Sequence, residues 1–318
     1  MLESRTVAEK TAKMHLVTDQ EYREFVRTHE HVVIEKIKVG VGREWKIGKY
    51  APNQGYKPEG TTVWSFPDRG DWATHVGNYR GNFSPFIPRN LIEKYTTKGN
   101  LVLDQMVGSG TTLVECKLLQ RDAIGMDINP DAIMVARDRL NFSYKSLDRD
   151  LGQDYAEPKI RTYVGDARSL DKIEGNSVDL IITHPPYAYI IGYSKDKIEG
   201  DVSRLRRLSD YSEAMGKIAD ESYRVLKGGK YCAILIGDTR KHRHYIPIAI
   251  RVMQEFLNAG FILKEDIIKL QHNVSTNRGR WRGAYYDFYK IMHEHLFVFR
   301  KPLEQEKLTQ FKLSAKWW

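Results

Sequence analysis

From about residue 100 onward, short apolar runs alternate with longer amphipathic stretches. The apolar runs predict strands at Leu101–Asp104, Ala123–Asp127, Arg161–Val164, Val178–Thr183 and Lys230–Ile236. The stretches between and after them predict helices at Thr111–Gln120, Pro130–Leu140, Ser209–Leu226 and Tyr245–Ala259. Such alternation is typical of a parallel sheet with crossover helices. We therefore predict an α/β fold.

Two more extended segments follow the last predicted helix, Phe261–Leu270 and His293–Arg300. The polar insert 271–291 joins them, so we predict an antiparallel pair at one edge of the sheet.

The first 80 residues are less regular. Thr18 and Glu21 have the spacing of a capping box, which predicts a helix through about Thr28, and residues 31–39 alternate like a strand. Residues 49–81 are rich in Gly, Pro and aromatic side chains, so we interpret them as an ordered segment that wraps the domain rather than as a linker. Its large aromatic residues are expected mainly in the core, although part of the segment can cover a ligand: Trp64, Trp72 and Tyr79.

The composition favours a polyanionic partner. Lys and Arg number 50 against 41 Asp and Glu, a formal net charge of +9. Two cysteines, Cys116 and Cys232, make neither a disulfide framework nor a four-ligand zinc site, so we expect buried packing residues and no metal. There is no apolar run of ~18 residues and no signal-peptide core, so we expect a cytoplasmic protein without a membrane partner.

Three carboxylates, Asp104, Asp127 and Asp166, each close one of three successive predicted strands. After the first strand, Gly108-Ser-Gly110 precedes a helix, and such a turn lets the backbone approach a ligand closely. The dinucleotide and phosphate-loop patterns both fail here. Asp127 can accept hydrogen bonds from ribose hydroxyls, and Asp166 can accept one from an adenine amino group. The alternative is that each carboxylate caps the helix that follows it.

The fourth strand ends in His184-Pro185-Pro186-Tyr187. Consecutive prolines stop a strand and leave a carbonyl with no competing ladder partner. The tyrosine offers a flat face on which a flipped base can stack, and the polar residue before the prolines can hold an amino group. This arrangement suits catalysis by positioning and local electrostatics.

Four segments, LVLDQMVGSGTTLVE, GMDINP, GDARSL and THPPY, resemble in this order the motifs of the DNA amino-methyltransferases, the N6-adenine and N4-cytosine family. The upstream stretch NFSPFIPRNLIEKYT is similar to the family segment that packs near the methionine part of the cofactor. Downstream, YRVLKGGKYCAILIGD and MHEHLFVFRK are similar to its later strands. The resemblance covers roughly residues 80–302.

The resemblance implies a Rossmann-like class I methyltransferase fold with a mostly parallel seven-stranded sheet, an antiparallel edge strand and an N-terminal extension. It implies S-adenosyl-L-methionine as cofactor and double-stranded DNA as partner. By motif position, the expected cofactor-binding residues are Asp104, Met106, Gly108, Gly110, Thr111, Asp127, Ile128, Asp166, Ala167, Phe83, Ser84 and Pro85. The residues expected to handle the base are His184, Pro185, Pro186 and Tyr187. We divide the chain into an extension (1–80), a methyltransferase domain (81–302) and a tail (303–318).

His184 departs from the family pattern, which usually carries Asp, Asn or Ser at this position. A neutral imidazole can still accept an amino hydrogen, and its tautomer and pKa then affect the rate. The alternative is that His184 merely supports the loop. The choice between adenine and cytosine stays open, as do the recognition sequence, a cognate restriction endonuclease and a homodimer.

Three basic clusters flank the motif and are expected to contact DNA through phosphates, base edges and stacking. Their alternative is a solvated surface. The DNA-binding candidates are Arg206, Arg207, Arg240, Arg278, Arg280, Trp281 and Arg282.

Other functions remain as alternatives. A cysteine-nucleophile C5-cytosine methyltransferase is disfavoured, because neither cysteine follows a proline. An RNA base amino-methyltransferase shares Pro-Pro-Tyr-like motifs but usually adds an RNA-binding domain. A non-catalytic nucleic-acid-binding subunit would have the same fold, and intact Asp104, Gly108 and Gly110 argue against it.

Overall fold

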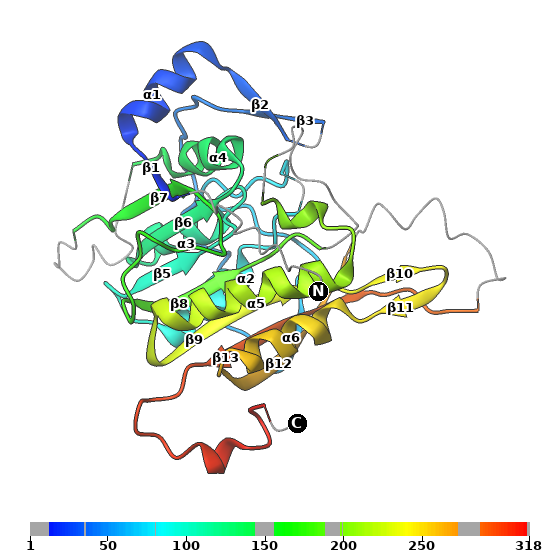
Figure 1. Cartoon of the computed structure of the whole chain (residues 1–318). Helices are drawn as coiled ribbons and strands as arrows, with labels where there is room; N and C mark the ends of the chain where they lie inside the picture. The colour runs from blue at the N-terminus through cyan, green and yellow to red at the C-terminus, as the bar shows by residue number, and fades with distance from the viewer. Residues whose placement is uncertain are drawn as a thin grey trace, which may run out of the picture.

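The computed structural model describes residues 13–34, 36–79, 81–143, 156–187, 198, 200–272 and 287–316. Within these residues, nine strands form one sheet in the order β1-β7-β6-β5-β8-β9-β13-β12-β4 (Figure 1). The strands are β1 (His15–Val17), β4 (Val63–Ser65), β5 (Leu101–Asp104), β6 (Asp122–Asp127), β7 (Ile160–Val164), β8 (Val178–Thr183), β9 (Leu226–Ile236), β12 (Ile262–Leu270) and β13 (His293–Arg300).

The sheet is mostly parallel, and the predicted fold class is confirmed. Strands β5 to β9 run parallel to one another, and β13 lies antiparallel between β9 and β12. The sheet is wider than the seven strands expected, because β1 and β4 of the N-terminal extension add one strand at each edge. The antiparallel β13 therefore lies inside the sheet, and β1 is the antiparallel edge strand.

Helices cover both faces of the sheet. One face carries the neighbouring α2, α3 and α4, and the other carries α5 and α6. Their bounds are α2 (Phe86–Tyr95), α3 (Thr111–Leu118), α4 (Pro130–Leu140), α5 (Leu208–Val225) and α6 (Ile248–Asn258), with the 3-10 turns η2 (Val202–Arg204) and η4 (Leu308–Phe311).

Two hydrophobic cores follow from the alternation of side chains along each strand. On β5, Leu103 joins the core under α5 and α6, whereas Val102 joins the core under α2, α3 and α4. On β8, Ile181 joins the core under α5 and α6, and Leu180 joins the core under α2, α3 and α4. Because strands covered on both faces are apolar throughout, the run Val178–Thr183 is buried at every position.

The N-terminal extension adds a small layer above α4. The capping box of Thr18 and Glu21 is present, and it opens α1 (Asp19–Thr28) as predicted. The segment expected as one strand is instead a hairpin of β2 (His31–Ile34) and β3 (Ile37–Gly40), because the chain turns at Lys36, whose φ is 69°.

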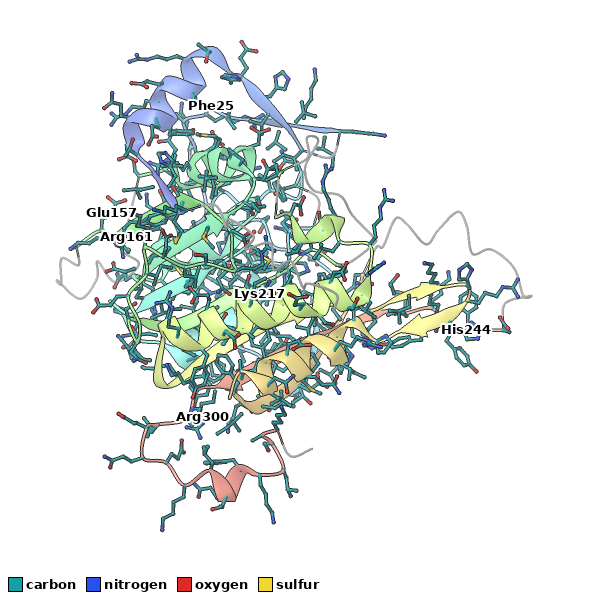
Figure 2. All side chains as sticks on the ribbon, in the orientation of Figure 1. Phe25, Glu157, Arg161, Lys217, His244 and Arg300 are labelled. Carbon is teal, nitrogen blue, oxygen red and sulfur yellow. The ribbon has the colours of Figure 1, made fainter. Side chains whose placement is uncertain are left out.

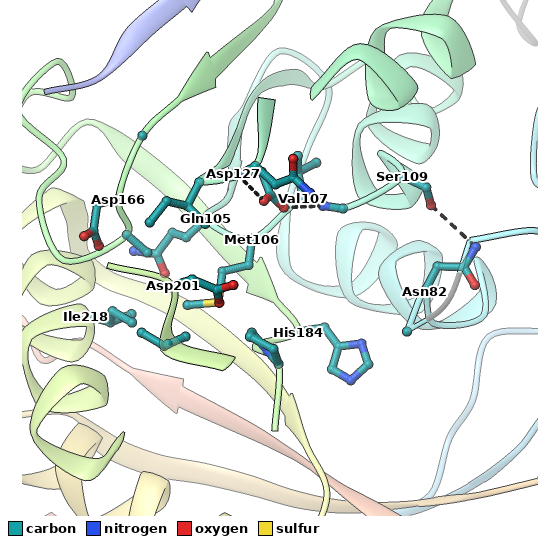
Figure 3. Close-up of a pocket in the computed structure, with 18 of the residues that line it drawn as sticks. Asn82, Gln105, Met106, Val107, Ser109, Asp127, Asp166, His184, Asp201 and Ile218 are labelled. Atoms are coloured by element: carbon teal, nitrogen blue, oxygen red, sulfur yellow. Dashed lines mark hydrogen bonds between the residues drawn. The ribbon is translucent and has the colours of Figure 1, made fainter. Parts of the chain in front are cut away.

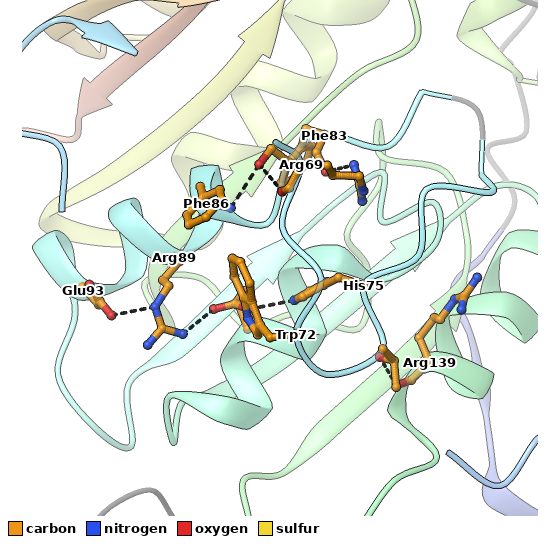
Figure 4. Close-up of polar contacts among 11 residues, drawn as sticks. Arg69, Trp72, His75, Phe83, Phe86, Arg89, Glu93 and Arg139 are labelled. Atoms are coloured by element: carbon orange, nitrogen blue, oxygen red, sulfur yellow. Dashed lines mark hydrogen bonds and ion pairs between the residues drawn. The ribbon is translucent and has the colours of Figure 1, made fainter. Parts of the chain in front are cut away.

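In the wrapping segment, residues 49–81, the three aromatic residues expected in the core are buried: Trp64, Trp72 and Tyr79. Trp72 and His75 both donate hydrogen bonds of 2.7 Å to the buried carboxylate of Glu115 on α3 (Figure 4). Arg89 on α2 donates to the same carboxylate at 3.0 Å. This clasp, made by Trp72, His75, Arg89 and Glu115, fixes the wrapping segment to the helical layer.

Both cysteines are buried and free, as predicted. No helix of the described residues has the length and apolar character needed to cross a membrane.

Candidate active site

A pocket with about 850 Å³ of empty space, part of it open to solvent, lies where β5, β6, β7 and β8 end at the carboxyl edge of the sheet (Figure 3). Open α/β sheets bind ligands at this edge. The predicted site residues that line the pocket are Phe83, Met106, Gly108, Thr111, Asp127, Ile128, Asp166, Ala167, His184 and Pro186. The predicted residues outside its lining are Asp104, Gly110, Ser84, Pro85, Pro185 and Tyr187.

The two glycines of the turn after β5 have different structural roles. Gly108 has a φ of 50°, and a Cβ there would lie 3.2 Å from the ring of Tyr79. Gly110 has a φ of 84°, and a Cβ there would lie 3.0 Å from Ala136 on α4. Gly108 thus opens the pocket wall under Tyr79, whereas Gly110 permits close packing of the turn against α4.

Asp127 ends β6, and both of its carboxylate oxygens accept backbone hydrogen bonds. Oδ2 accepts from the N–H of Gly108 at 3.0 Å, and Oδ1 accepts from the N–H of Asn129 at 2.9 Å. Burial raises the pKa of Asp127 to about 6 in spite of these bonds. The carboxylate therefore connects the glycine turn with the loop after β6 and faces the pocket.

Asp166, after β7, is paired with Arg168. The guanidinium donates to both carboxylate oxygens, and the Nη2 to Oδ2 distance is 2.7 Å. The backbone N–H of Arg168 also donates to Oδ1 at 2.9 Å. Asp201, a residue that the sequence did not suggest, lines the same side of the pocket and accepts from Ser203 at 2.6 Å.

Asp104 lies below the pocket, where it supports the glycine turn. Its Oδ2 accepts from the Thr112 hydroxyl at 2.6 Å, and its Oδ1 accepts from the N–H of Met106 at 3.2 Å. Burial raises the pKa of Asp104 to about 7. A residue expected to touch the cofactor thus contacts the loop that lines the pocket.

The turn before α2 is held by Arg69 of the wrapping segment. Its Nη1 donates to the carbonyl of Phe83 at 2.6 Å, and its own carbonyl accepts from the Ser84 hydroxyl at 2.8 Å. Pro85 is the N-cap residue of α2. Of this predicted trio, Phe83 alone lines the pocket.

The loop after β8 brings His184 and Pro186 into the pocket wall. His184 lies beside Phe83, with 5.7 Å between ring centroids. Burial lowers the pKa of His184 to about 4, so its imidazole is neutral at physiological pH. Tyr187 lies outside the lining of the pocket. Its ring packs closely against Gly237, since a Cβ added to Gly237 would lie 2.7 Å from the Tyr187 ring.

Two groups that sequence reasoning missed, the buried Glu294 and the partly exposed Lys269, extend from this loop into the sheet. The Tyr187 hydroxyl donates to Oε1 of Glu294 at 2.6 Å, and Lys269 donates to Oε2 of Glu294 at 2.8 Å. Glu294 occupies a buried position of β13. A carboxylate inside an apolar strand is the signal that could have identified it, because buried charges are retained where they have partners.

Of the predicted DNA-binding residues, Arg206 and Arg207 are exposed and follow the pocket-lining Val202 closely in the chain. Arg240 is less available for contact with DNA. It donates to the carbonyls of Arg243 and Tyr289, and its guanidinium lies 4.9 Å from the ring centroid of Phe288. The other four candidates lie outside the described residues: Arg278, Arg280, Trp281 and Arg282.

Arg240 belongs to a hairpin of β10 (Thr239–Lys241) and β11 (His244–Ile246). The sequence analysis placed the last two residues of this hairpin in the helix that begins at Ile248 in the structure. The hairpin extends away from the body of the molecule, with His244 at its periphery (Figure 2). Its exposed residues are Lys241, His242, Arg243, His244 and Tyr245.

A family model described as DNA methylase matches residues 6–138 and 178–316. The Type II methyltransferase M.HpaI of Haemophilus parainfluenzae is 38% identical over 114 residues, which cover 32% of this chain and 34% of that protein. The Type II methyltransferase M.BsoBI of Geobacillus stearothermophilus is 43% identical over 53 residues, which cover 16% of this chain and 10% of that protein. The chain thus spans about a third or less of the length of these relatives.

Solved structures show more distant similarity. A SAM-dependent methyltransferase from Methanosarcina mazei has 14% sequence identity and a TM-score of 0.45, with 67% of this chain and 98% of that chain covered. A methyltransferase from Pyrococcus furiosus has 15% identity and a TM-score of 0.42, with 73% and 93% covered.

Proposed function

The chain belongs to the DNA methylase family, and we propose that it transfers a methyl group from S-adenosylmethionine to the exocyclic amino group of adenine (N6) or cytosine (N4) in double-stranded DNA. One observation carries the proposal. A single pocket at the carboxyl edge of the sheet is lined both by Asp127, expected to hold the cofactor, and by His184, expected to hold the base.

The described residues fit the cofactor. We assign the ribose hydroxyls to Asp127, a carboxylate that two backbone hydrogen bonds hold at the pocket wall. Asp166 and Asp201 add carboxylate oxygens to the lining as hydrogen-bond acceptors, and their charges are paired with Arg168 and Arg204. Apolar surface for an adenine ring comes from Ile128 and Ala167.

S-adenosylmethionine supplies an electrophilic methyl group on its sulfonium. The protein's part is to hold the acceptor amine in line with that methyl and to exclude water, which is catalysis by positioning. Pro186 and His184 form the wall next to the cofactor half of the pocket. On transfer, the bond between sulfur and the methyl carbon would break, S-adenosylhomocysteine would be the leaving group, and the methylated nitrogen would lose one hydrogen as a proton that is finally released to solvent.

A target base in duplex DNA reaches this pocket by being flipped out of the helix. We assign its aromatic support to Tyr187, by motif position, and to Phe83, whose ring lies in the pocket wall. Tyr79, from the wrapping segment, lines the cofactor side above Gly108.

DNA contact is assigned to two exposed basic elements. Arg206 and Arg207 lie just before α5, and the β10–β11 hairpin presents Lys241 and Arg243. Arg240 serves within this interface as an anchor of the hairpin, because its donors already bind carbonyls. Since the relatives are Type II methyltransferases, we also propose a cognate restriction endonuclease as partner, and a homodimer remains part of the proposal.

The proposal is tested by incubating the purified protein with labelled S-adenosylmethionine and unmethylated plasmid DNA, with tRNA in parallel. Nucleoside mass spectrometry then identifies the product. We expect N6-methyladenine or N4-methylcytosine in the DNA, which also decides between the two bases. Label found in the tRNA alone would contradict the DNA assignment and would favour the RNA amino-methyltransferase alternative.

A further inference from the structure

A chain of polar side chains runs from the sheet to the catalytic loop. Lys269 on β12 and Glu294 on β13 are directly opposite each other in the antiparallel ladder. Lys269 Nζ donates to Glu294 Oε2 at 2.8 Å, and Tyr187 Oη donates to Glu294 Oε1 at 2.6 Å. His184 Nε2 lies 2.8 Å from the same Tyr187 oxygen. We call these four residues the relay.

The ionised carboxylate of Glu294 sets the direction of the hydrogen bonds in the relay. Burial is the largest single influence and acts to raise the pKa of Glu294, but the Lys269 ammonium, the nearby His184 and the hydrogen bonds from Lys269 and Tyr187 together outweigh it, and the pKa lies below the usual range. An ionised carboxylate only accepts hydrogen bonds, and a phenol has one hydrogen to donate. The Tyr187 hydrogen is therefore committed to Glu294. Toward His184, the Tyr187 oxygen can act only as an acceptor.

The direction of these bonds selects the tautomer of His184. Because Tyr187 accepts, Nε2 must carry a hydrogen. Because the ring is neutral, with a pKa lowered to about 4 by burial, the other nitrogen, Nδ1, has a bare lone pair. Nδ1 is buried and makes no hydrogen bond of good geometry with a described residue. The Gly81 backbone lies close enough to the ring to act on its pKa, and both residues line the pocket. The direction of the relay thus makes Nδ1 an acceptor before a base binds.

Building on the proposed function, we propose that Lys269, Glu294 and Tyr187 are positioning residues that keep His184 Nδ1 as the acceptor for a hydrogen of the target amino group. An acceptor at this position pairs with the N–H of adenine N6 or cytosine N4. A base that presents a carbonyl oxygen there would place two acceptors against each other. The relay therefore also selects amino-bearing bases over those with a carbonyl on the same edge.

Glu294→Gln tests the direction of the relay while nearly preserving side-chain size. Lys269 can only donate, so the new amide turns its oxygen toward Lys269 and its NH₂ toward Tyr187. The Tyr187 hydrogen then turns to His184 Nε2, which moves the histidine hydrogen to Nδ1 and removes the acceptor. We expect kcat to fall roughly 100-fold, with the affinity for S-adenosylmethionine unchanged.

Two further variants separate the relay from mere structural support. Tyr187→Phe keeps the ring for stacking but removes the hydroxyl that connects Glu294 with His184, so it should lower kcat as well. In the Tyr187→Phe background, Glu294→Gln should cause no additional loss, because the two changes act through one path. A matched control, Glu306→Gln, removes the carboxylate paired with Arg300 of β13 away from the pocket, and it should leave kcat unchanged.

The tautomer itself is measured by NMR of the full-length protein with ¹⁵N-labelled histidine rings, with His184 assigned from a His184→Asn sample. We expect the hydrogen on Nε2 in the wild type and on Nδ1 in Glu294→Gln. A wild-type hydrogen on Nδ1, or a Glu294→Gln or Tyr187→Phe variant with full kcat, would overturn the relay. The NMR result stands even if the wild type methylates no DNA, so failure of the relay is distinguishable from failure of the proposed function.

Discussion

Asp127 is the residue on which cofactor binding should depend most directly. Its raised pKa of about 6 means that the carboxyl is protonated below that pH and ionised above it. Ribose hydroxyls and a cationic ligand both favour the ionised form, so binding is opposed by a proton below pH 6.

We predict that the affinity for S-adenosylmethionine is constant above about pH 7 and falls by up to about tenfold per pH unit below pH 6. Calorimetric titration of the protein between pH 5 and pH 8 measures this. The Asp127→Asn variant should bind weakly with no such pH dependence. A wild-type affinity that is level across this whole range would contradict the assignment.

Gly237 limits where the Tyr187 ring can lie. A Cβ at this position would be 2.7 Å from Cε2 and 3.1 Å from Cζ of Tyr187, so Gly237→Ala must displace the ring. We predict a loss of turnover of roughly 100-fold with little change in cofactor affinity, because positioning errors of this size act on the reaction geometry. Gly60→Ala, where a Cβ would meet no atom within 4 Å, is the control in the same kinetic assay. Normal turnover of Gly237→Ala would show that the ring position does not matter.

At the scale of elements, we propose that the β10–β11 hairpin enters a groove of the DNA. A two-stranded β-ribbon fits the major groove of B-DNA, and this hairpin projects from the end of β9. Arg240 stabilises it from within, whereas Lys241 and Arg243 are exposed.

We predict that Lys241→Ala and Arg243→Ala each weaken DNA binding and reduce the slope of log affinity against log salt concentration by about one. Fluorescence anisotropy with duplex DNA at several salt concentrations measures both effects. Lys307→Ala, an exposed lysine in the tail, is the control. If the two hairpin variants retain the wild-type salt slope, DNA is bound elsewhere on the protein.

The central elements were predictable from sequence because they are long, apolar and regular. The bounds of β5, β8, α4 and β13 agree with the sequence patterns residue for residue. Strands β1 and β4 have three residues each, too few for a periodic pattern, and they form only because the sheet edges offer partners. The hairpin was missed because the alternation in residues 239–246 is interrupted by a turn with positive φ at His242 and Arg243.

The site residues were predictable where a polar side chain lies at the carboxyl end of a predicted strand. Asp127, Asp166 and His184 lie together because parallel strands end at one edge. Asp104 differs because its side chain turns beneath the glycine loop toward Thr112, which no linear pattern reveals. Asp201 lines the pocket and Glu294 contacts Tyr187 from a distant strand. A carboxylate in a buried strand could have drawn attention to Glu294, but spacing along the chain does not reveal the partners of either residue.

At the scale of the whole molecule, the clasp at Glu115 joins the wrapping segment to α2 and α3. Its carboxylate is fully buried and accepts from three side chains. Removal of one partner of a buried ion pair leaves the other charge without compensation.

We predict that Glu115→Ala lowers the free energy of unfolding by about 3–5 kcal/mol, because it leaves Arg89 buried without this carboxylate. Glu93→Ala removes the other, half-exposed carboxylate that pairs with Arg89 and should cost about 1 kcal/mol or less. Urea denaturation monitored by tryptophan fluorescence measures both values. Equal effects of the two changes would refute the clasp.

The central claim is that one pocket has a cofactor half at Asp127 and a target half at His184. The most direct test measures S-adenosylmethionine affinity and DNA methylation together for the wild type, Asp127→Asn and His184→Ala. We predict that Asp127→Asn weakens cofactor binding about ten- to a hundredfold, whereas His184→Ala binds the cofactor normally and loses methylation. If His184→Ala methylates DNA at the wild-type rate, or if Asp127→Asn binds the cofactor as the wild type does, this division of the pocket is wrong.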